Sequence, residues 1–137
     1  MNRRKSRETA MKLSYEMSIK KDGVEEVLEN FKENTDSDLN ELDMEYITRV
    51  LKGVENNTED LDKKIEEKLI NWKLNRLSKI DLAILRISVY ELLFEKDIPN
   101  RVSVNEAIEL AKTFSPDATG GFINAVLDRF IKEDETE

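Results

Sequence analysis

Residues 78–94 read Ser-Lys-Ile-Asp-Leu-Ala-Ile-Leu-Arg-Ile-Ser-Val-Tyr-Glu-Leu-Leu-Phe. Apolar residues recur on nearly every side of the helix that this stretch predicts, so the helix must be surrounded by others. Ser78, with Asp81 three residues later, is a variant of the capping box that starts helices. We therefore expect the stretch to form the central helix of an all-α fold. Its two charged residues, Arg86 and Glu91, are interpreted as structural or interface residues, because a charge on an apolar helix needs a partner.

Amphipathic patterns on both sides of this stretch predict further helices, and no segment is a convincing strand. Asp43 is the expected cap of the third helix, Asn56-Asn57-Thr58 its end, and Ser103 with Glu106 a capping box near the C-terminus. Seven helices are expected in all: about 3–20, 24–31, 43–54, 58–69, 78–94, one from the box at 103, and one after the loop at 115–121. Residues 1–137 are expected to form one domain, with a basic first helix or arm at 1–21 and an acidic tail at 133–137.

The composition excludes several kinds of chemistry. The chain has no Cys and no His, which removes disulfides, thiolate metal sites and any Ser-His nucleophile. No Gly-rich nucleotide loop occurs, and the many Asp and Glu residues fall mostly on polar helix faces. We expect no enzyme activity, no cofactor and no metal. Neither an apolar run long enough for a bilayer nor a signal peptide is found, so we expect a cytoplasmic protein.

Charge is distributed unevenly along the chain. Residues 1–21 carry a net +5, while the remaining 116 residues carry −13. Cations at the start of a helix oppose its dipole, so Arg3, Arg4, Lys5 and Arg7 suggest a use such as phosphate binding. A solvated terminus is the open alternative. If the arm binds RNA, neutralising Arg3, Arg4 and Arg7 should weaken binding and leave folding nearly unchanged, because exposed terminal positions contribute little stability.

The loop before the last helix is a second candidate site. Thr119, Gly120, Gly121 and Phe122 open a helix whose first N–H groups have no internal acceptor, which suits an anion. Phe122 can stack on a base, as in binders of single-stranded RNA. Spacing alone leaves open the alternative that Phe122 is a core residue.

Several strings resemble the NusB family. The segments 3–8, with Ala10 and Tyr15 after them, and 81–87, with Tyr90-Glu91-Leu92, are similar to its arginine-rich first helix and its central helix. Asp97-Ile98-Pro99 and the segments 105–112 and 122–128 complete a resemblance over essentially the whole chain. It implies seven helices, in two packed three-helix bundles with a linking helix.

The resemblance also implies a function. Members of the family bind the boxA element of nascent ribosomal RNA transcripts as a heterodimer with the ribosomal protein NusE. With other Nus factors they join the RNA polymerase elongation complex and suppress termination. The implied RNA-binding residues are Arg3, Arg4, Arg7, Lys12, Gly121, Phe122 and Asn124. The implied NusE-binding residues are Tyr15, Ile19 and Asp81.

This sequence departs from the family at one place, and other interpretations compete. The loop 115–121 lacks the polar and basic residues often found in relatives, which puts side-chain contacts from it in doubt. Some ribosomal RNA cytosine methyltransferases carry a similar domain, but they need a Gly-rich cofactor loop and a Cys nucleophile, which this sequence lacks. A helical adaptor that binds only protein is favoured by the acidic body and disfavoured by the basic arm. The free chain is also a candidate homodimer.

Overall fold

The fold is all-helical, as predicted. The computed structural model describes residues 2–36, 38–115 and 119–136, and no strand occurs among them. The helices are α1 (Arg3–Lys20), α2 (Val24–Asn34), α3 (Met44–Glu67), α4 (Lys79–Phe94), α5 (Asn100–Phe114) and α6 (Gly120–Thr136), with short 3₁₀ turns η1 (Leu39–Glu41) and η2 (Leu74–Arg76). None of these helices is long and apolar enough to cross a membrane.

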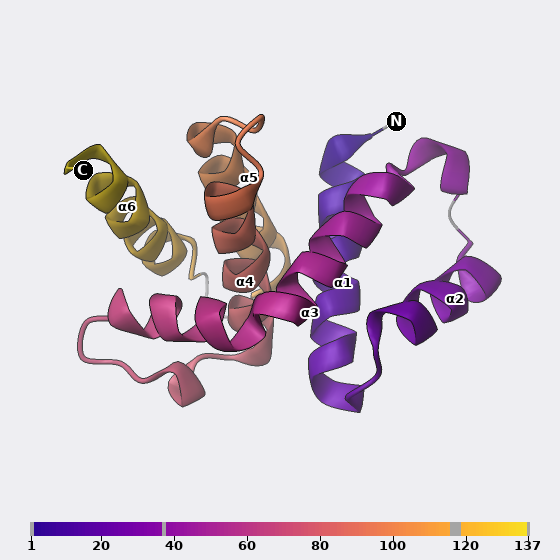
Figure 1. Cartoon of the computed structure of the whole chain (residues 1–137), viewed down its shortest axis with the longest axis horizontal. Helices are drawn as coiled ribbons and strands as arrows, with labels where there is room; N and C mark the ends of the chain where they lie inside the picture. Colours follow the sequence, from indigo (N-terminus) through magenta and orange to yellow (C-terminus); the bar gives the residue numbers. More distant parts are fainter. Residues whose placement is uncertain (1, 37, 116–118, 137) are drawn as a thin grey trace.

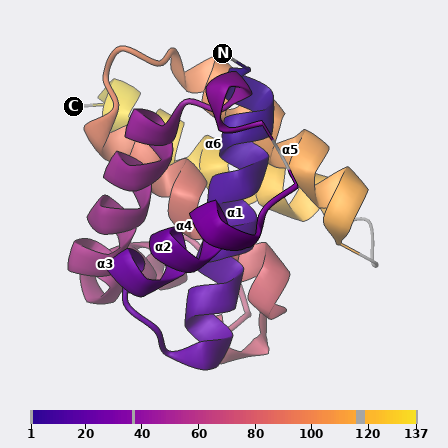
Figure 2. The same cartoon turned by 90° about the vertical axis from the view of Figure 1, so that its right-hand side faces the viewer.

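The helices form two groups joined by α3. In Figure 1, α1, α2 and the first half of α3 lie on one side, α4, α5 and α6 on the other, and α3 runs across from the first group to the second. Figure 2 shows α2 lying in front of α1, with the second group behind. The predicted pair of three-helix groups is therefore present, and the role expected of a separate linking helix falls to the second half of α3.

Helix α4 lies at the centre, as its sequence predicts. It packs against α1, α3, α5 and α6. Apolar side chains on several of its sides are fully buried, among them Ile84, Leu85 and Ile87. The Ser78 side chain accepts a hydrogen bond from the Asp81 N–H at 3.0 Å, which confirms the predicted cap.

One predicted helix break is wrong. The sequence predicts two helices at 43–54 and 58–69, but α3 runs through Asn56-Asn57-Thr58 without interruption. Two of these polar side chains form hydrogen bonds with carbonyls of their own helix. The Thr58 hydroxyl donates to the Val54 carbonyl at 2.6 Å, and the Asn57 amide donates to the Gly53 carbonyl at 2.7 Å. The described residues therefore contain six α-helices rather than seven. Asp43 caps α3 as predicted, since its carboxylate accepts from the Tyr46 N–H.

The predicted capping box at residue 103 is also wrong. Helix α5 begins at Asn100, immediately after Pro99. The Ser103 hydroxyl is buried and donates to the carboxylate of Glu91, and Glu106 binds Arg4. Of the predicted loop at 115–121, residues 116–118 lie outside the described residues, as does Glu137 of the predicted acidic tail. Helix α6 begins at Gly120 and continues to Thr136.

Gly53 of α3 allows close contact with α4. A Cβ atom at this position would lie 2.2 Å from Cε2 of Tyr90, whose ring is stacked on Phe94 at a centroid distance of 5.2 Å. Alanine normally stabilises a helix interior relative to glycine by about 1 kcal/mol. Here we expect Gly53→Ala to destabilise the protein by about 1–3 kcal/mol in urea unfolding, because the buried Tyr90 ring must be displaced.

The matched control is Gly121→Ala, because no atom lies within 4 Å of a Cβ built on Gly121. Its free energy of unfolding should be unchanged or slightly higher. Equal effects of the two substitutions would contradict the close contact between α3 and α4.

Candidate nucleic-acid interface

The first turn of α1 is fixed to the start of α3. The Asn2 side chain caps α1 by accepting from the Lys5 N–H at 3.0 Å, and the Asn2 N–H donates to the Glu41 carbonyl at 2.7 Å. The Ser6 hydroxyl donates to the Asn2 carbonyl and accepts from the Asp43 N–H, both at 2.8 Å. The basic arm is therefore part of the folded domain rather than a solvated terminus.

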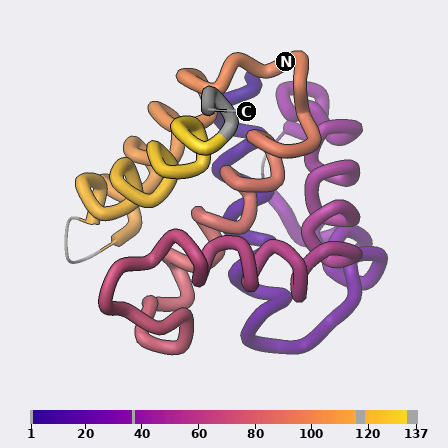
Figure 3. Tube along the Cα trace, turned by 60° about the vertical axis from the view of Figure 1, so that its left-hand side comes forward, coloured from indigo at the N-terminus to yellow at the C-terminus, as the bar shows by residue number. Residues whose placement is uncertain are grey.

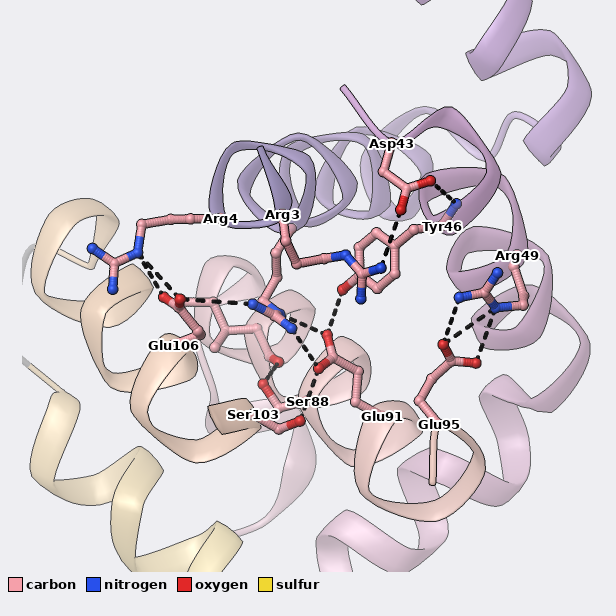
Figure 4. A network of polar contacts seen from close by, with 12 residues as sticks. Arg3, Arg4, Asp43, Tyr46, Arg49, Ser88, Glu91, Glu95, Ser103 and Glu106 are labelled. Carbon is pink, nitrogen blue, oxygen red and sulfur yellow. Dashed lines mark hydrogen bonds and ion pairs between the residues drawn. The ribbon is translucent and has the colours of Figure 1, made fainter. Parts of the chain in front are cut away.

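Acidic side chains from elsewhere in the chain neutralise the arm. Arg3 pairs with Asp43 at 3.1 Å, and Lys5 with Glu41 at 3.5 Å. The guanidinium of Arg3 also lies over the Tyr46 ring, 4.5 Å from its centroid. Arg4 pairs with Glu106 at 3.0 Å. Figure 4 shows Arg3 beside Asp43 and Tyr46, and Arg4 beside Glu106. The positive end of the molecule is therefore less positive than the sequence of residues 1–21 suggests.

Arg7 lies on the inner side of α1. Its side chain is only 3% exposed and makes a bidentate pair with Glu91 of α4, at 2.7 and 2.9 Å. A second carboxylate, Glu106 of α5, lies 3.8 Å from the same guanidinium. The sequence-based assignment of Arg7 to RNA is thus corrected: a buried, paired guanidinium is not available to a phosphate. The expectation that Arg7 can be neutralised without affecting folding is corrected for the same reason.

Glu91 accepts hydrogen bonds from three helices. Besides Arg7 of α1, the Tyr46 hydroxyl of α3 donates to Oε2, and the Ser103 hydroxyl of α5 donates to Oε1 at 2.8 Å. The carboxylate is fully buried, and none of the buried side-chain polar atoms among the described residues lacks a partner. Figure 4 shows Tyr46 and Ser103 converging on Glu91. The structural interpretation of Glu91 is confirmed.

The surroundings of Glu91 fix the protonation of its donors. Burial raises the pKa of the Tyr46 hydroxyl, and the adjacent Glu91 carboxylate raises it further, so the hydroxyl remains a donor. Burial alone would lower the pKa of the Arg7 guanidinium, but the hydrogen bonds and charge of Glu91 outweigh burial and raise it. Arg86, the other charged residue of α4, makes a bidentate pair with Asp62 of α3 at 2.7 and 2.8 Å, which confirms its structural interpretation.

The outward face of α1 carries the remaining candidate RNA contacts. Arg4, Glu8 and Lys12 follow one another at four-residue spacing, so they share a face. The Arg4 side chain is 72% exposed. The ammonium of Lys12 lies over the ring of Phe114, 5.0 Å from its centroid, at the end of α5. The face therefore leads from the first turn of α1 towards the end of α5.

The start of α6 offers both backbone and side-chain groups. Gly121 and Asn124 are exposed, whereas Phe122 is half-buried against the core. The ring of Phe122 meets that of Trp72 edge to face, with 6.4 Å between centroids. The core alternative for Phe122 is confirmed in part, since the ring packs against the core, and its stacking on a base stays a prediction. Trp72 is not among the residues that the sequence predicts for the site, because it lies in a stretch without helical periodicity.

The three candidate partner-binding residues differ in their exposure to solvent. Tyr15 is half-buried and Ile19 is exposed, one turn apart on α1. Asp81, in contrast, is buried and accepts a hydrogen bond from the Thr119 hydroxyl at 2.8 Å. Its assignment to a partner is corrected, because its carboxylate holds the start of α6 against α4. A groove of about 320 Å³ near this end of α1, between α3 and α4, has Met17 and Leu82 in its wall.

Comparison with known proteins gives the same family at the level of sequence and structure. Residues 4–132 match the model of the NusB family. The transcription antitermination protein NusB of Clostridium novyi (strain NT) is 62% identical over 96% of this chain and 99% of that protein. A crystal form of T. maritima NusB superposes with a TM-score of 0.86, at 36% identity over 97% of this chain and 92% of that one. A crystal structure of the antitermination factors NusB and NusE with double-stranded RNA contains a chain of the same fold, with a TM-score of 0.81 and 23% identity over 95% of this chain and 96% of that one.

Replacing Arg7 tests the buried pair. Arg7→Gln should lower the free energy of unfolding by about 3–5 kcal/mol, because it leaves the Glu91 charge buried without its cation. The matched control is Arg4→Gln, which removes an exposed partner of Glu106 and should cost at most about 1 kcal/mol. Urea unfolding of both variants measures the difference. Similar costs for the two would contradict a structural role confined to Arg7.

Asp43 gives a pH-dependent contribution to stability. The hydrogen bond from the Tyr46 N–H lowers the pKa of Asp43, and Arg3 lowers it further, although burial opposes both. A carboxyl group with a lowered folded-state pKa stabilises the protein above its unfolded value, about 3.9, and the contribution is lost as pH falls through the folded value. Asparagine caps helices as well as aspartate does. Asp43→Asn should therefore be less stable than the original chain near neutral pH, and the difference should vanish in acid. A constant difference from about pH 7 to pH 2 would show that the charge of Asp43 contributes nothing.

Proposed function

Because the chain belongs to the NusB family, we propose that it is a transcription antitermination factor that binds boxA RNA together with NusE. In this role it joins the RNA polymerase elongation complex with other Nus factors, and we assign it no catalytic step. The observation that carries the proposal is the outward face of α1, where exposed cations lead from Arg4 past Lys12 to Phe114 at the end of α5. Gly120 at the start of α6 lies against Ile108 and Lys112 of the same α5.

The RNA surface proposed here has two parts. Arg3, Arg4 and Lys12 supply cations from α1, and Gly121, Phe122 and Asn124 line the start of α6. The contact between Lys12 and Phe114 supports their continuity, since Phe114 is the last residue of α5 before the loop into α6. Open space around Gly121 lets a ribose or phosphate approach the backbone.

NusE is proposed to bind beside the second half of α1. Tyr15 and Ile19 lie there, on the helix that carries the cations, so the two binding sites adjoin. The chain of the same fold in complex with NusE and double-stranded RNA supports this pairing of partners.

The partner is needed because the surface of the chain alone suits RNA poorly. Arg3, Arg4 and Lys5 already face Asp43, Glu106 and Glu41, and the chain outside residues 1–21 carries −13. That negative field is only partly screened, since the Debye length at physiological salt is about 8 Å. A basic partner beside α1 extends the positive surface and offsets the acidic body.

The test is calorimetry of NusE binding with and without a boxA RNA, and of boxA RNA binding with and without NusE. Adjoining sites are expected to be coupled by about 1–3 kcal/mol, and each ligand must tighten the other by the same factor. In the complex, Arg4→Gln with Lys12→Gln should flatten the slope of log K against log salt by about 1.4, because each neutralised phosphate on single-stranded RNA accounts for about 0.7 of that slope.

The control is Lys52→Gln with Lys63→Gln, which removes two exposed lysines of α3 and should leave the slope unchanged. If NusE binds and RNA does not, under any salt condition, the chain is an adaptor for protein alone. If RNA and NusE bind without affecting each other, the proposed adjoining sites are wrong.

A further inference from the structure

The linker between α3 and α4, together with the first two residues of α4, is a second concentration of positive charge. Residues 68–80 contain Lys68, Lys73, Arg76 and Lys79 and no Asp or Glu. This is unusual in a chain with a net charge of −8. Figure 3 shows the linker at the lower left of the molecule, below α6.

Most of these cations have no acidic partner within the described part of the chain. Lys73, Arg76 and Lys79 are exposed, and none of them takes part in an ion pair found among residues 2–36, 38–115 and 119–136. The fourth cation, Lys68, pairs with Glu133. On the arm, in contrast, Arg3, Arg4, Lys5 and Arg7 each face a carboxylate. A phosphate would therefore have fewer carboxylates to displace at the linker than at the arm.

The packing of the linker explains why these side chains point outward. Leu74 and Leu77 are half-buried against the core. Glu66, near the end of α3, accepts a hydrogen bond from the Leu74 N–H at 2.8 Å, so its carboxylate holds the backbone rather than a lysine. The main-chain carbonyl of Lys68 accepts from Arg129 of α6 at 2.5 Å, which fixes the linker to the helix that starts at the RNA surface.

Trp72 lies in this linker with 55% of its surface exposed. Its ring and that of Phe122 are inclined by 70°, an edge-to-face contact that leaves part of Trp72 open to solvent. A hollow of about 210 Å³ between the linker and α6 has both rings in its wall. Exposed aromatic rings flanked by cations are the combination that binds single-stranded nucleic acids, because bases stack on the rings and phosphates meet the cations.

From this arrangement we infer that the RNA surface continues beyond Phe122 onto the linker, where Trp72 stacks on a base and Lys73 and Arg76 contact phosphates. The inference rests on the proposed function and extends it to a longer single-stranded RNA. Charge disfavours an apolar protein partner for this patch, since such a contact would bury unpaired cations at a cost.

Trp72 is the only tryptophan of the chain, so its fluorescence reports on the site directly. The probes are a boxA RNA and the same RNA extended by about ten nucleotides at either end, with lengths chosen to exceed the site size of one binding fold. In the complex with NusE, emission is taken as the difference between the original chain and Trp72→Phe. An extended RNA should quench this emission and shield it from acrylamide, and the short RNA should do so less.

Affinity measurements test the same contact. Trp72→Ala should weaken binding of the extended RNA by about 5- to 100-fold, and Trp72→Phe should retain most of the affinity because it keeps a ring for stacking. Neutralising Lys73 and Arg76 with glutamine should flatten the salt slope by up to about 1.4 units. The matched control is Ile70→Ala, an apolar residue of the same linker that is 61% exposed but has no ring. It should bind RNA as the original chain does.

The outcomes separate this inference from the proposed function. If the original chain with NusE does not bind boxA RNA, the proposed function fails. If it binds, but Trp72→Ala binds the extended RNA equally well and the emission is unaltered, only the linker site is overturned. An equal loss in Ile70→Ala and Trp72→Ala would also overturn it, as would quenching that follows protein concentration without RNA, since either result indicates a protein interface.

Discussion

A single buried carboxylate organises this fold. Glu91 of α4 receives hydrogen bonds from Arg7 of α1, Tyr46 of α3 and Ser103 of α5, so four helices meet at one charge. A buried ion costs several kcal/mol in solvation and is tolerated only when its partners are complete. The helices must therefore meet in one arrangement, because a shift of any of the four leaves Glu91 short of a donor. Apolar packing alone is less selective, since cores tolerate many combinations of similar volume.

This constraint also determines which face of α1 reaches solvent. With Arg7 turned inward to Glu91, the face that carries Arg4, Glu8 and Lys12 is turned outward. Asn2 and Ser6 then tie the first turn to residues 41–43, so the helix begins as a rigid element. The pair that stabilises the domain thus also orients the candidate RNA contacts, and a basic motif of four residues serves two purposes.

Much of the fold was predictable from local sequence, but the helix boundaries and the contacts between distant segments were not. Periodicity predicted α1 and the central helix α4, because apolar spacing reflects burial directly. The break expected at residues 56–58 failed because Asn57 and Thr58 bond to carbonyls of their own helix, a choice that sequence does not reveal. The inward turn of Arg7 depends on a partner 84 residues away in the sequence. The only sign of this pair in the sequence was Glu91, because a charge on an apolar helix requires a partner, and the sequence did not identify which cation it is.

The basic side chains differ in how readily they can form an ion pair with a phosphate. Arg7 is held by a buried charge and cannot leave without exposing Glu91 to an apolar core. Arg4 and Glu106 form a pair in which the arginine is largely solvated, and such pairs contribute no more than about 1 kcal/mol, so exchange of the carboxylate for a phosphate costs little. Lys73, Arg76 and Lys79 have no ion-pair partner to give up among the described residues. A chain with a negative net charge can therefore bind RNA. Its affinity depends on the surface cations that are free to pair with phosphates, rather than on the net charge of the whole chain.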